Sequence, residues 1–305
     1  MTEPRWLPAP PRTRPLFPGG PEVSTLSWGM WRMTGDDVTE ARRLVEAALD
    51  AGITLLDTAD IYGYSSPSGF GGAERLLGRV LAQAPGLRER MVLATKGGII
   101  PGTPYDSSAA YVAEAIDASL ARLKVERVEL WQVHRPDILT HPQELARTLE
   151  NAVASGKVGA VGVSNFTPAQ VAALRALLTV PLASLQPEFS PLCLEPMENG
   201  LFDEAMVHGT AVLAWSPLGG GRVMAPGTPR EEAVAAALDR VAAAHGVSRS
   251  AATYSWVMAH PAGAIPIVGS QQPARIAEAV DAYRVRWTRG DWYAVQVASR
   301  GVRLP

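Results

Sequence analysis

The chain has 305 residues, enough for one large α/β barrel or for two domains of ordinary size. Hydrophobic residues make up 47% of it and charged residues 19%, a balance that provides a large core and excludes an intrinsically disordered chain. The formal net charge of −2 gives no reason to expect nucleic acid or an anionic membrane as a partner.

The N-terminal segment Met1–Pro21 is rich in proline and arginine and lacks the apolar stretch of a secretory signal. We expect residues 1–22 to form an irregular arm, followed by a single domain of residues 23–305 that ends in a C-terminal helix. No apolar run reaches the length of a membrane span. The only cysteine, Cys193, cannot form an internal disulfide, which favours a reducing, cytoplasmic location.

Short apolar runs alternate with longer amphipathic segments along the rest of the chain. The short runs are typical of buried strands, and the longer segments are typical of helices. In chain order, the predicted elements are the strand Val23–Leu26, the helix Val38–Asp50, the strand Ile53–Leu56, the helix Ala73–Ala82, the strand Met91–Thr95, the helix Tyr111–Leu123, the strand Val128–Val133, the helix Pro142–Ala154, the strand Val158–Val163, the helix Pro168–Leu177, the strand Ala183–Gln186, the helix Leu201–His208, the strand Ala211–Trp215, the helix Ala251–Ala259, the strand Ala264–Val268 and the helix Ala274–Tyr283. Eight strands that alternate with helices favour a closed (β/α)8 TIM barrel.

An open, doubly wound sheet is the alternative fold. It would place a turn of the form Gly-x-Gly-x-x-Gly directly after an early strand. The nearest candidate, Gly69–Glu74, has a glutamate in place of the last glycine and follows no predicted strand, so we interpret it as a loop. The segments Gly219–Gly221 and Pro226–Pro229 fall in one long loop after the seventh strand, where barrel proteins often bind ligands.

Ionisable residues follow three consecutive predicted strands. Asp57, Lys96 and His134 each stand directly after a strand, at the end where barrel enzymes have their active sites. Tyr62 follows Asp57 in a loop that can fold over the same opening. We therefore expect these four side chains to meet at one place.

Together the four residues suit proton donation to a carbonyl group that accepts a hydride. A free tyrosine has a pKa of about 10, too high for an efficient acid near neutral pH. The ammonium group of Lys96 is expected to lower that pKa by roughly one to three units. Asp57 is expected to keep Lys96 charged and oriented, and His134 to hydrogen-bond the carbonyl oxygen or to tune the tyrosine.

Two segments resemble signatures of the aldo-keto reductase superfamily. They are Asp57–Gly63, with the sequence Asp-Thr-Ala-Asp-Ile-Tyr-Gly, and Gly156–Phe166. Lys96 and His134 match the rest of that superfamily's catalytic tetrad. The resemblance implies an enzyme that reduces small aldehydes or ketones with NADP(H) and uses Tyr62 as its proton donor. The segments His134–Asp137 and Trp215–Arg222 resemble a bacterial branch of uncharacterised oxidoreductases.

The resemblance also implies a set of cofactor contacts. The residues it assigns are Ser164, Asn165 and Gln186 for the nicotinamide carboxamide, Trp215 for the nicotinamide face, Ser216, Pro217, Leu218, Gly219 and Gly220 for the pyrophosphate, Gly269, Ser270, Gln271 and Arg275 for the adenosine ribose, and Gly29, Met30 and Asp57 as further contacts. Two departures bear on the choice of cofactor. Many relatives have a lysine in the stretch Ile267–Gln272 that binds the 2′-phosphate, and many have an asparagine where this chain has Ala279. We expect NADPH to be preferred through Arg275, with NAD(H) as the alternative cofactor.

Two other functions compete with this one. A metal-dependent hydrolase would need clustered histidine or carboxylate ligands, but of the five histidines only His134 ends a predicted strand. A regulatory or sensor protein of the same fold would bind the cofactor with little turnover, and the complete tetrad argues against it. The sequence carries no signal for an oligomeric state.

Overall fold

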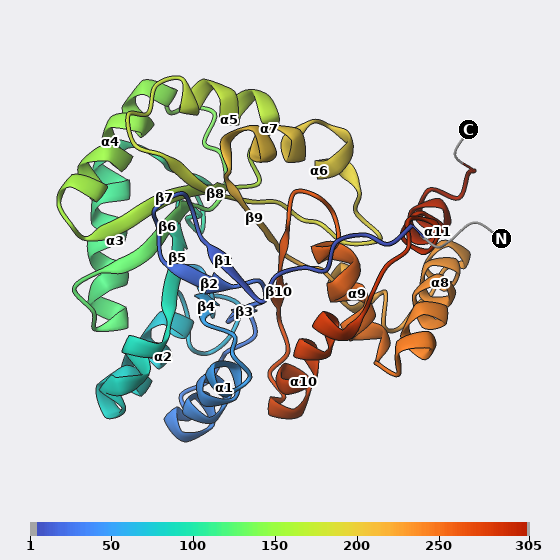
Figure 1. The fold of residues 1–305 in the computed structure, drawn as a ribbon. Coiled ribbons are helices and arrows are strands. Elements are labelled where there is room, and N and C mark those ends of the chain that lie inside the picture. The colour runs from blue at the N-terminus through green and yellow to red at the C-terminus, as the bar shows by residue number, and fades with distance from the viewer. Residues whose placement is uncertain (1–4, 304–305) are drawn as a thin grey trace.

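The computed structural model describes residues 5–303, and its centre is a closed barrel of eight parallel strands ringed by helices (Figure 1). The barrel strands are β3 (Ser27–Gly29), β4 (Leu55–Asp57), β5 (Val92–Gly97), β6 (Val128–Val133), β7 (Val158–Ser164), β8 (Leu182–Gln186), β9 (Ala211–Ala214) and β10 (Ile265–Val268). They follow one another around the barrel in chain order, and β10 closes it by pairing with β3. The predicted (β/α)8 fold is confirmed.

Helices cover the outside of the barrel. They are α1 (Val38–Asp50), α2 (Gly72–Gln83), α3 (Ala109–Leu123), α4 (Pro142–Ala154), α5 (Pro168–Arg175), α6 (Glu195–Glu198), α7 (Leu201–His208), α8 (Pro229–His245), α9 (Arg249–Met258), α10 (Pro273–Glu278) and α11 (Arg289–Arg300). The described part of the chain begins and ends on the side of α8 and α11 (Figure 1).

Polar residues at the helix starts explain where several helices begin. The Asp37 side chain accepts hydrogen bonds from the backbone N–H groups of Thr39 and Glu40 at the start of α1. Thr167 and Gln170 form a reciprocal capping box at the start of α5. Because the first N–H groups of a helix have no partner within it, each cap stabilises its helix by about 1 kcal/mol.

The N-terminal arm and the first strand differ from the prediction. Residues Thr13–Pro15 (β1) and Glu22–Ser24 (β2) form a short antiparallel hairpin, and the first barrel strand begins only at Ser27. Leu16 and Val23 are fully buried in the apolar cluster that fills the barrel interior. The apolar character of Val23 therefore reflects burial beneath the barrel, and the predicted strand Val23–Leu26 was wrong in its position.

The long loop predicted after the seventh strand is shorter than expected. Residues from Pro229 onward form α8, a helix that packs against α11, and the Thr228 side chain caps its first turn. The predicted helix Ala274–Tyr283 is broken into α10 and a 3-10 segment, Ala279–Arg284. A helix as short as α10 has little macrodipole of its own, so its N-terminus adds little to the attraction of an anion near Arg275.

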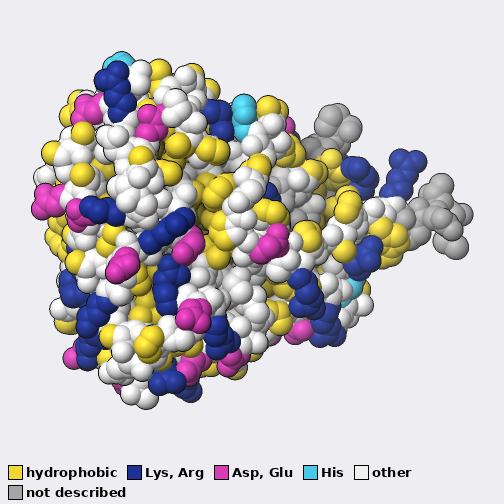
Figure 2. All heavy atoms as spheres, turned by 60° about the vertical axis from the view of Figure 1, so that its left-hand side comes forward, with side chains coloured by type: hydrophobic (Ala, Val, Ile, Leu, Met, Phe, Trp, Pro, Cys, Tyr) yellow, Lys and Arg dark blue, Asp and Glu magenta, His cyan; other side chains and the backbone are white. Residues whose placement is uncertain are grey.

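One face of the molecule carries both signs of charge without a broad field of either (Figure 2). Figure 2 shows basic and acidic side chains interspersed over one face, with apolar side chains between them. Within residues 5–303, no helix is long and apolar enough to cross a membrane. The same residues contain no cluster of three or more side chains that could hold a metal ion.

Candidate active site

The four predicted catalytic residues converge at the carboxyl end of the barrel. Asp57 is the last residue of β4, Lys96 lies near the end of the neighbouring strand β5, and His134 follows β6 directly. Tyr62 stands in the loop after β4, which is held to β5 by the bond from the Asp60 N–H to the Lys96 carbonyl. All four side chains are buried, with Tyr62 and His134 still 8% and 9% exposed.

Lys96 and Asp57 form a buried ion pair. The Lys96 Nζ donates to Asp57 Oδ2 at 2.7 Å and to the Thr58 carbonyl at 2.8 Å. Burial by itself would lower the pKa of Lys96, but the Asp57 carboxylate and the neighbouring Tyr62 raise it by more, and the net direction is upward. Lys96 is therefore charged at neutral pH, as expected from the sequence.

Tyr62 lies against both Lys96 and His134. The Lys96 Nζ is 5.0 Å from the centre of the Tyr62 ring, and the Tyr62 and His134 ring centres are 5.8 Å apart. Burial raises the pKa of Tyr62 above its ordinary value, and the Lys96 charge only partly opposes this rise. The lowered pKa expected from the sequence was therefore wrong for this structure, since desolvation outweighs the ammonium group, and Tyr62 carries its proton at neutral pH.

His134 is a neutral imidazole in this setting. Burial lowers its pKa well below the ordinary value, and the positive charges of Lys96 and Arg135 lower it further. A neutral ring can donate through one nitrogen and accept through the other. It can therefore hydrogen-bond a carbonyl oxygen or the tyrosine hydroxyl without adding a charge to the site.

A second buried carboxyl group lies behind the tetrad and was missed by the sequence analysis. Asp60 is 1% exposed, its Oδ1 has no hydrogen-bond partner among the described residues, and its Oδ2 is 3.5 Å from the Tyr111 hydroxyl. Burial and the Glu74 carboxylate raise the pKa of Asp60 to about 8, although Arg122 opposes the shift. Its place inside the motif Asp57–Gly63 was the signal that could have drawn attention to it.

One side of the barrel mouth is a chain of hydrogen bonds among predicted cofactor residues. The Asn165 side-chain amide donates to Ser164 Oγ at 2.7 Å, and the Trp215 indole donates to Asn165 Oδ1 at 2.9 Å. Asn165 and Ser216 have left-handed backbone conformations, with φ of 61° and 54°. Such conformations are costly for residues other than glycine and gather at functional sites.

Gln186, expected at the nicotinamide carboxamide, contacts Asp57 in this structure. Its Nε2 donates to Asp57 Oδ1 at 3.0 Å, so the side chain binds the acidic partner of the Lys96–Asp57 ion pair, and it is 2% exposed. The Ser164 hydroxyl donates to the Gln186 carbonyl at 2.8 Å. In this structure Gln186 holds Asp57, and the role expected for it at the carboxamide remains a prediction.

The backbone N–H groups of the glycine-rich turn after β9 form hydrogen bonds within the turn. The N–H of Gly219 donates to the Ser216 carbonyl at 2.7 Å, and the N–H of Gly220 donates to Ser216 Oγ at 2.8 Å. The N–H of Gly221 donates to the Leu218 carbonyl at 3.1 Å. These N–H groups are therefore engaged within the turn, whereas the sequence suggested that the glycines would present them to a pyrophosphate.

The predicted adenosine residues lie where β10 meets β3. The Trp28 indole donates to the Ser270 carbonyl at 2.9 Å, and Gln271 Nε2 donates to the Gly29 carbonyl at 3.4 Å. Met30, next to Gly29, is fully buried, and Gly269 directly follows β10. Arg275 is exposed at the surface of α10. The residues assigned to the cofactor thus extend from the tetrad to the β10–β3 seam.

The residues around this mouth fit a nicotinamide dinucleotide. Asn165 and Ser164 offer an amide and a hydroxyl, and Trp215 offers an aromatic ring beside them. Two buried polar atoms, His134 Nδ1 and Gln271 Oε1, have no partner among the described residues. Polar atoms that lack partners inside a protein commonly await a ligand or water.

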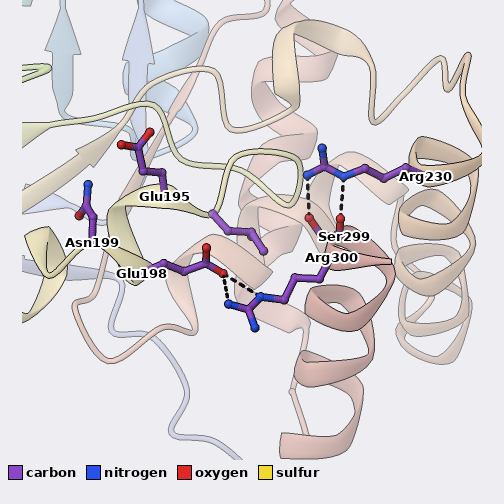
Figure 3. A pocket seen from close by; sticks show the side chains of 7 residues that line it. Glu195, Glu198, Asn199, Arg230, Ser299 and Arg300 are labelled. Carbon is purple, nitrogen blue, oxygen red and sulfur yellow. Dashed lines mark hydrogen bonds and ion pairs between the residues drawn. The ribbon is translucent and has the colours of Figure 1, made fainter. Parts of the chain in front are cut away.

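A separate surface hollow lies away from these residues. It has a volume of about 470 Å³ and is lined by Leu194, Glu195, Glu198, Asn199, Arg230, Ser299 and Arg300. Figure 3 shows that Arg300 pairs with Glu198 and that Arg230 bonds to Ser299, so both arginines of the hollow are already engaged. The tetrad has no part in it.

The chain is similar to known oxidoreductases over most of its length. A model of the aldo/keto reductase family matches residues 25–299. The chain is 62% identical to the 6-dehydroglucose reductase of Novosphingobium aromaticivorans, over 98% of this chain and 99% of that protein. It is 36% identical to the 6-dehydroglucose reductase of Agrobacterium fabrum, over 92% of this chain and 95% of that protein.

A solved structure gives the same result at the level of the fold. The glycerol dehydrogenase of Gluconobacter oxydans is similar with a TM-score of 0.83 and 29% identity, over 96% of this chain and 97% of that chain. The match covers both the barrel and its helices, and the family model spans nearly all the described residues. The chain therefore belongs to the aldo/keto reductase family of oxidoreductases.

Proposed function

We propose that this protein reduces the aldehyde group of a sugar such as 6-dehydroglucose to the primary alcohol, with NADPH as the hydride donor. The observation that carries the proposal is the convergence of Asp57, Tyr62, Lys96 and His134 at the barrel mouth. A protonated tyrosine beside a charged lysine and a neutral histidine suits general acid catalysis at a carbonyl oxygen.

Each residue of the tetrad has a distinct task in this proposal. The nicotinamide supplies a hydride to the carbonyl carbon when it is bound. Tyr62 donates its proton to the carbonyl oxygen, so that the aldehyde becomes an alcohol. Lys96 stabilises the negative charge that develops on the phenol oxygen, and Asp57 keeps Lys96 in place. His134 orients the carbonyl oxygen by a hydrogen bond.

The mouth of the barrel suits a polyhydroxylated substrate. Trp31 is 57% exposed and stands edge-on to Tyr62, with ring centres 5.1 Å apart. Arg135 lies over Trp215, with its guanidinium carbon 5.8 Å from the ring. Aromatic faces and a cation at one opening favour a ligand with both apolar ring faces and hydroxyl groups. The two 6-dehydroglucose reductases among the relatives support this substrate class.

The experiment that tests the proposal is a steady-state assay of purified protein. NADPH oxidation is followed with 6-dehydroglucose and with simple aldehydes such as propanal, and the product is identified as glucose by mass spectrometry. We expect one glucose for each NADPH oxidised, and a higher kcat/KM for 6-dehydroglucose than for propanal. Cofactor binding without reduction of any carbonyl compound would instead favour the regulatory or sensor function.

The Tyr62→Phe variant tests the acid in the same assay. Removing the hydroxyl group takes away the proton donor and should lower kcat about a hundredfold or more. The Kd for NADPH should stay within about twofold of the parent value, because the ring and its packing remain. A variant that kept most of its kcat would contradict the role given to Tyr62.

A further inference from the structure

Arg32 reaches across the seam between the first and last barrel strands. It lies in the loop after β3, and its Nη1 donates to the Gly269 carbonyl at the end of β10, at 3.4 Å. A Cβ atom built on Gly269 would meet the same Nη1 at 3.0 Å, and no other heavy atom within 4 Å. The Arg32 guanidinium therefore occupies the space that a side chain from position 269 would fill.

The charge of Arg32 is not neutralised in the described part of the chain. Its guanidinium forms no ion pair with any carboxylate of residues 5–303. Its single hydrogen bond, to the Gly269 carbonyl, is long for an N–H···O contact. Arg32 is exposed, and of the five N–H donors of its guanidinium only the one that bonds to Gly269 has a partner among the described residues.

Other polar groups surround this place. Ser270 presents a hydroxyl that accepts only the N–H of Gln272, at 3.2 Å, and the buried Gln271 Oε1 has no partner among the described residues. The Trp28 indole fixes the backbone here through the Ser270 carbonyl. The backbone at the seam is thus fixed by the Trp28 bond, and the Arg32 guanidinium beside it has no ionic partner among the described residues.

We propose that Arg32 is the main cation that recognises the 2′-phosphate of NADPH, an inference that rests on the cofactor choice proposed above. The 2′-phosphate is a dianion whose oxygens a guanidinium can bind through two parallel N–H groups. Arg32 is placed for this by its contact with Gly269, beside Ser270. Arg275, the residue favoured by the sequence, forms no hydrogen bond or ion pair in residues 5–303 that would hold it at the same place.

The test measures binding by calorimetry, without turnover. The ligands are NADPH and NADH, together with adenosine 2′,5′-bisphosphate and adenosine 5′-monophosphate, two probes that differ only in the 2′-phosphate. Arg32→Ala should weaken NADPH and the bisphosphate about ten- to hundredfold, the range expected for a hydrogen bond to a charged group. It should leave NADH and the monophosphate within about twofold, because they lack the dianion.

Two further variants serve as controls. Arg275→Ala should weaken the 2′-phosphorylated ligands less than Arg32→Ala does. Arg147→Ala changes an exposed arginine on α4, far from the seam in the barrel order, and should change none of the four affinities. Circular dichroism of each variant checks that the fold is kept.

A rescue variant tests the geometry. Since a Cβ on Gly269 meets only the Arg32 side chain, Gly269→Lys should be accommodated once Arg32 is alanine. The double variant Arg32→Ala/Gly269→Lys should then recover much of the affinity for adenosine 2′,5′-bisphosphate. Recovery of this affinity by a lysine at position 269 would show that a positive charge at the seam between β10 and β3 binds the 2′-phosphate.

The possible failures differ in their pattern. If the parent protein prefers NADPH and Arg32→Ala keeps that preference, the role of Arg32 is refuted while the cofactor choice stands. If Arg32→Ala weakens all four ligands equally, Arg32 contacts a part common to them and the inference is again wrong. If the parent protein binds NADH as tightly as NADPH, the cofactor choice itself fails, and carbonyl reduction is unaffected by that result.

Discussion

At the scale of single residues, the site depends on charges held out of water. Lys96 is fully buried and Asp57 is 2% exposed, and together with Gln186 they form a closed set of hydrogen bonds beneath Tyr62. Taking two charges out of water costs several kcal/mol, which their mutual attraction offsets only when the geometry is good. The pair is therefore more sensitive to losing one partner than to losing both.

The variant Lys96→Met should destabilise the protein by about 3–5 kcal/mol, because it leaves the Asp57 carboxylate buried without a cation. The double variant Asp57→Asn/Lys96→Met should recover part of this loss, since no charge then remains buried. Urea unfolding of the parent protein and the three variants, including Asp57→Asn alone, gives the coupling energy. A loss in the double variant equal to the sum of the two single losses would show that the charges act independently.

Asp60 leads to a prediction about pH. Its pKa is about 8 in the folded protein against 3.8 in the unfolded chain, chiefly because of burial and the Glu74 carboxylate. Between these values the unfolded chain releases the proton and the folded protein keeps it, so this group lowers stability as the pH rises from about 4 to about 8. Above that window both states are ionised and the effect is constant.

Asp60→Asn mimics the protonated acid at every pH and removes this dependence. Relative to the parent protein, the variant should gain stability on going from pH 5 to pH 8, by up to about 4 kcal/mol. Urea unfolding of both proteins at pH 5, 6.5 and 8 measures the difference. Parallel stability profiles across that range would mean that Asp60 is ionised in the fold at low pH.

At the scale of elements, the hairpin of β1 and β2 closes the bottom of the barrel. Leu16 and Val23 pack into the interior cluster with residues of the barrel strands such as Leu55, Leu130 and Leu213. The tetrad lies at the opposite, carboxyl end of the same strands. The hairpin should therefore contribute to stability without contributing to the chemistry.

The matched pair Leu16→Ala and Leu139→Ala tests this. Leu16 is fully buried, and its truncation should lower the free energy of unfolding by about 2–5 kcal/mol because it leaves a cavity in the barrel interior. Leu139 is 90% exposed, and its truncation should lower the free energy of unfolding by less than about 0.5 kcal/mol. Thermal unfolding gives both values, and KM for the carbonyl substrate should be the same in the two variants. A large rise in KM for Leu16→Ala would show that the hairpin also affects substrate binding at the barrel mouth.

At the scale of the whole molecule, the C-terminal helix α11 contacts helices from the last third of the chain. Trp256 on α9 and Trp292 on α11 stack with ring centres 4.8 Å apart, and each indole donates to the other residue's carbonyl at 3.1 Å. Arg230 of α8 donates to the Ser299 carbonyl at 2.6 Å. The helix α11 is thus bound both to α8 and to α9, which precede it in the chain by a strand and two short helical segments.

Trp292→Ala should remove the side-chain contact between α11 and α9. It should lower the free energy of unfolding by about 3–5 kcal/mol, the range for truncating a large buried aromatic side chain. Trp292→Phe keeps a ring but loses the N–H donor, and should cost less. Chemical unfolding followed by circular dichroism measures both. If the two substitutions lower the stability equally, the hydrogen bond donated by the Trp292 indole carries the stability and the stacking of the rings does not.

The sequence by itself determined the barrel and the position of the tetrad in it. Alternating apolar runs and amphipathic segments are local patterns, and the carboxyl ends of parallel strands must meet at one edge. Asp57, Lys96 and His134 could therefore be placed together from the strand pattern alone. The predicted starts of α1, α4, α5 and α7 agree with the structure, and at α1 and α5 a capping side chain acts within the first turn.

Only the tertiary structure decided what surrounds those residues. Burial of Val23 under the barrel, the bond from Gln186 to Asp57 and the approach of Arg32 to Gly269 each join positions far apart in the chain. The raised pKa of Tyr62 likewise depends on desolvation, which is set by all neighbours together and has no local signature in the sequence. Long-range contacts and burial are properties of the packed molecule, and for that reason they could not be predicted one residue at a time.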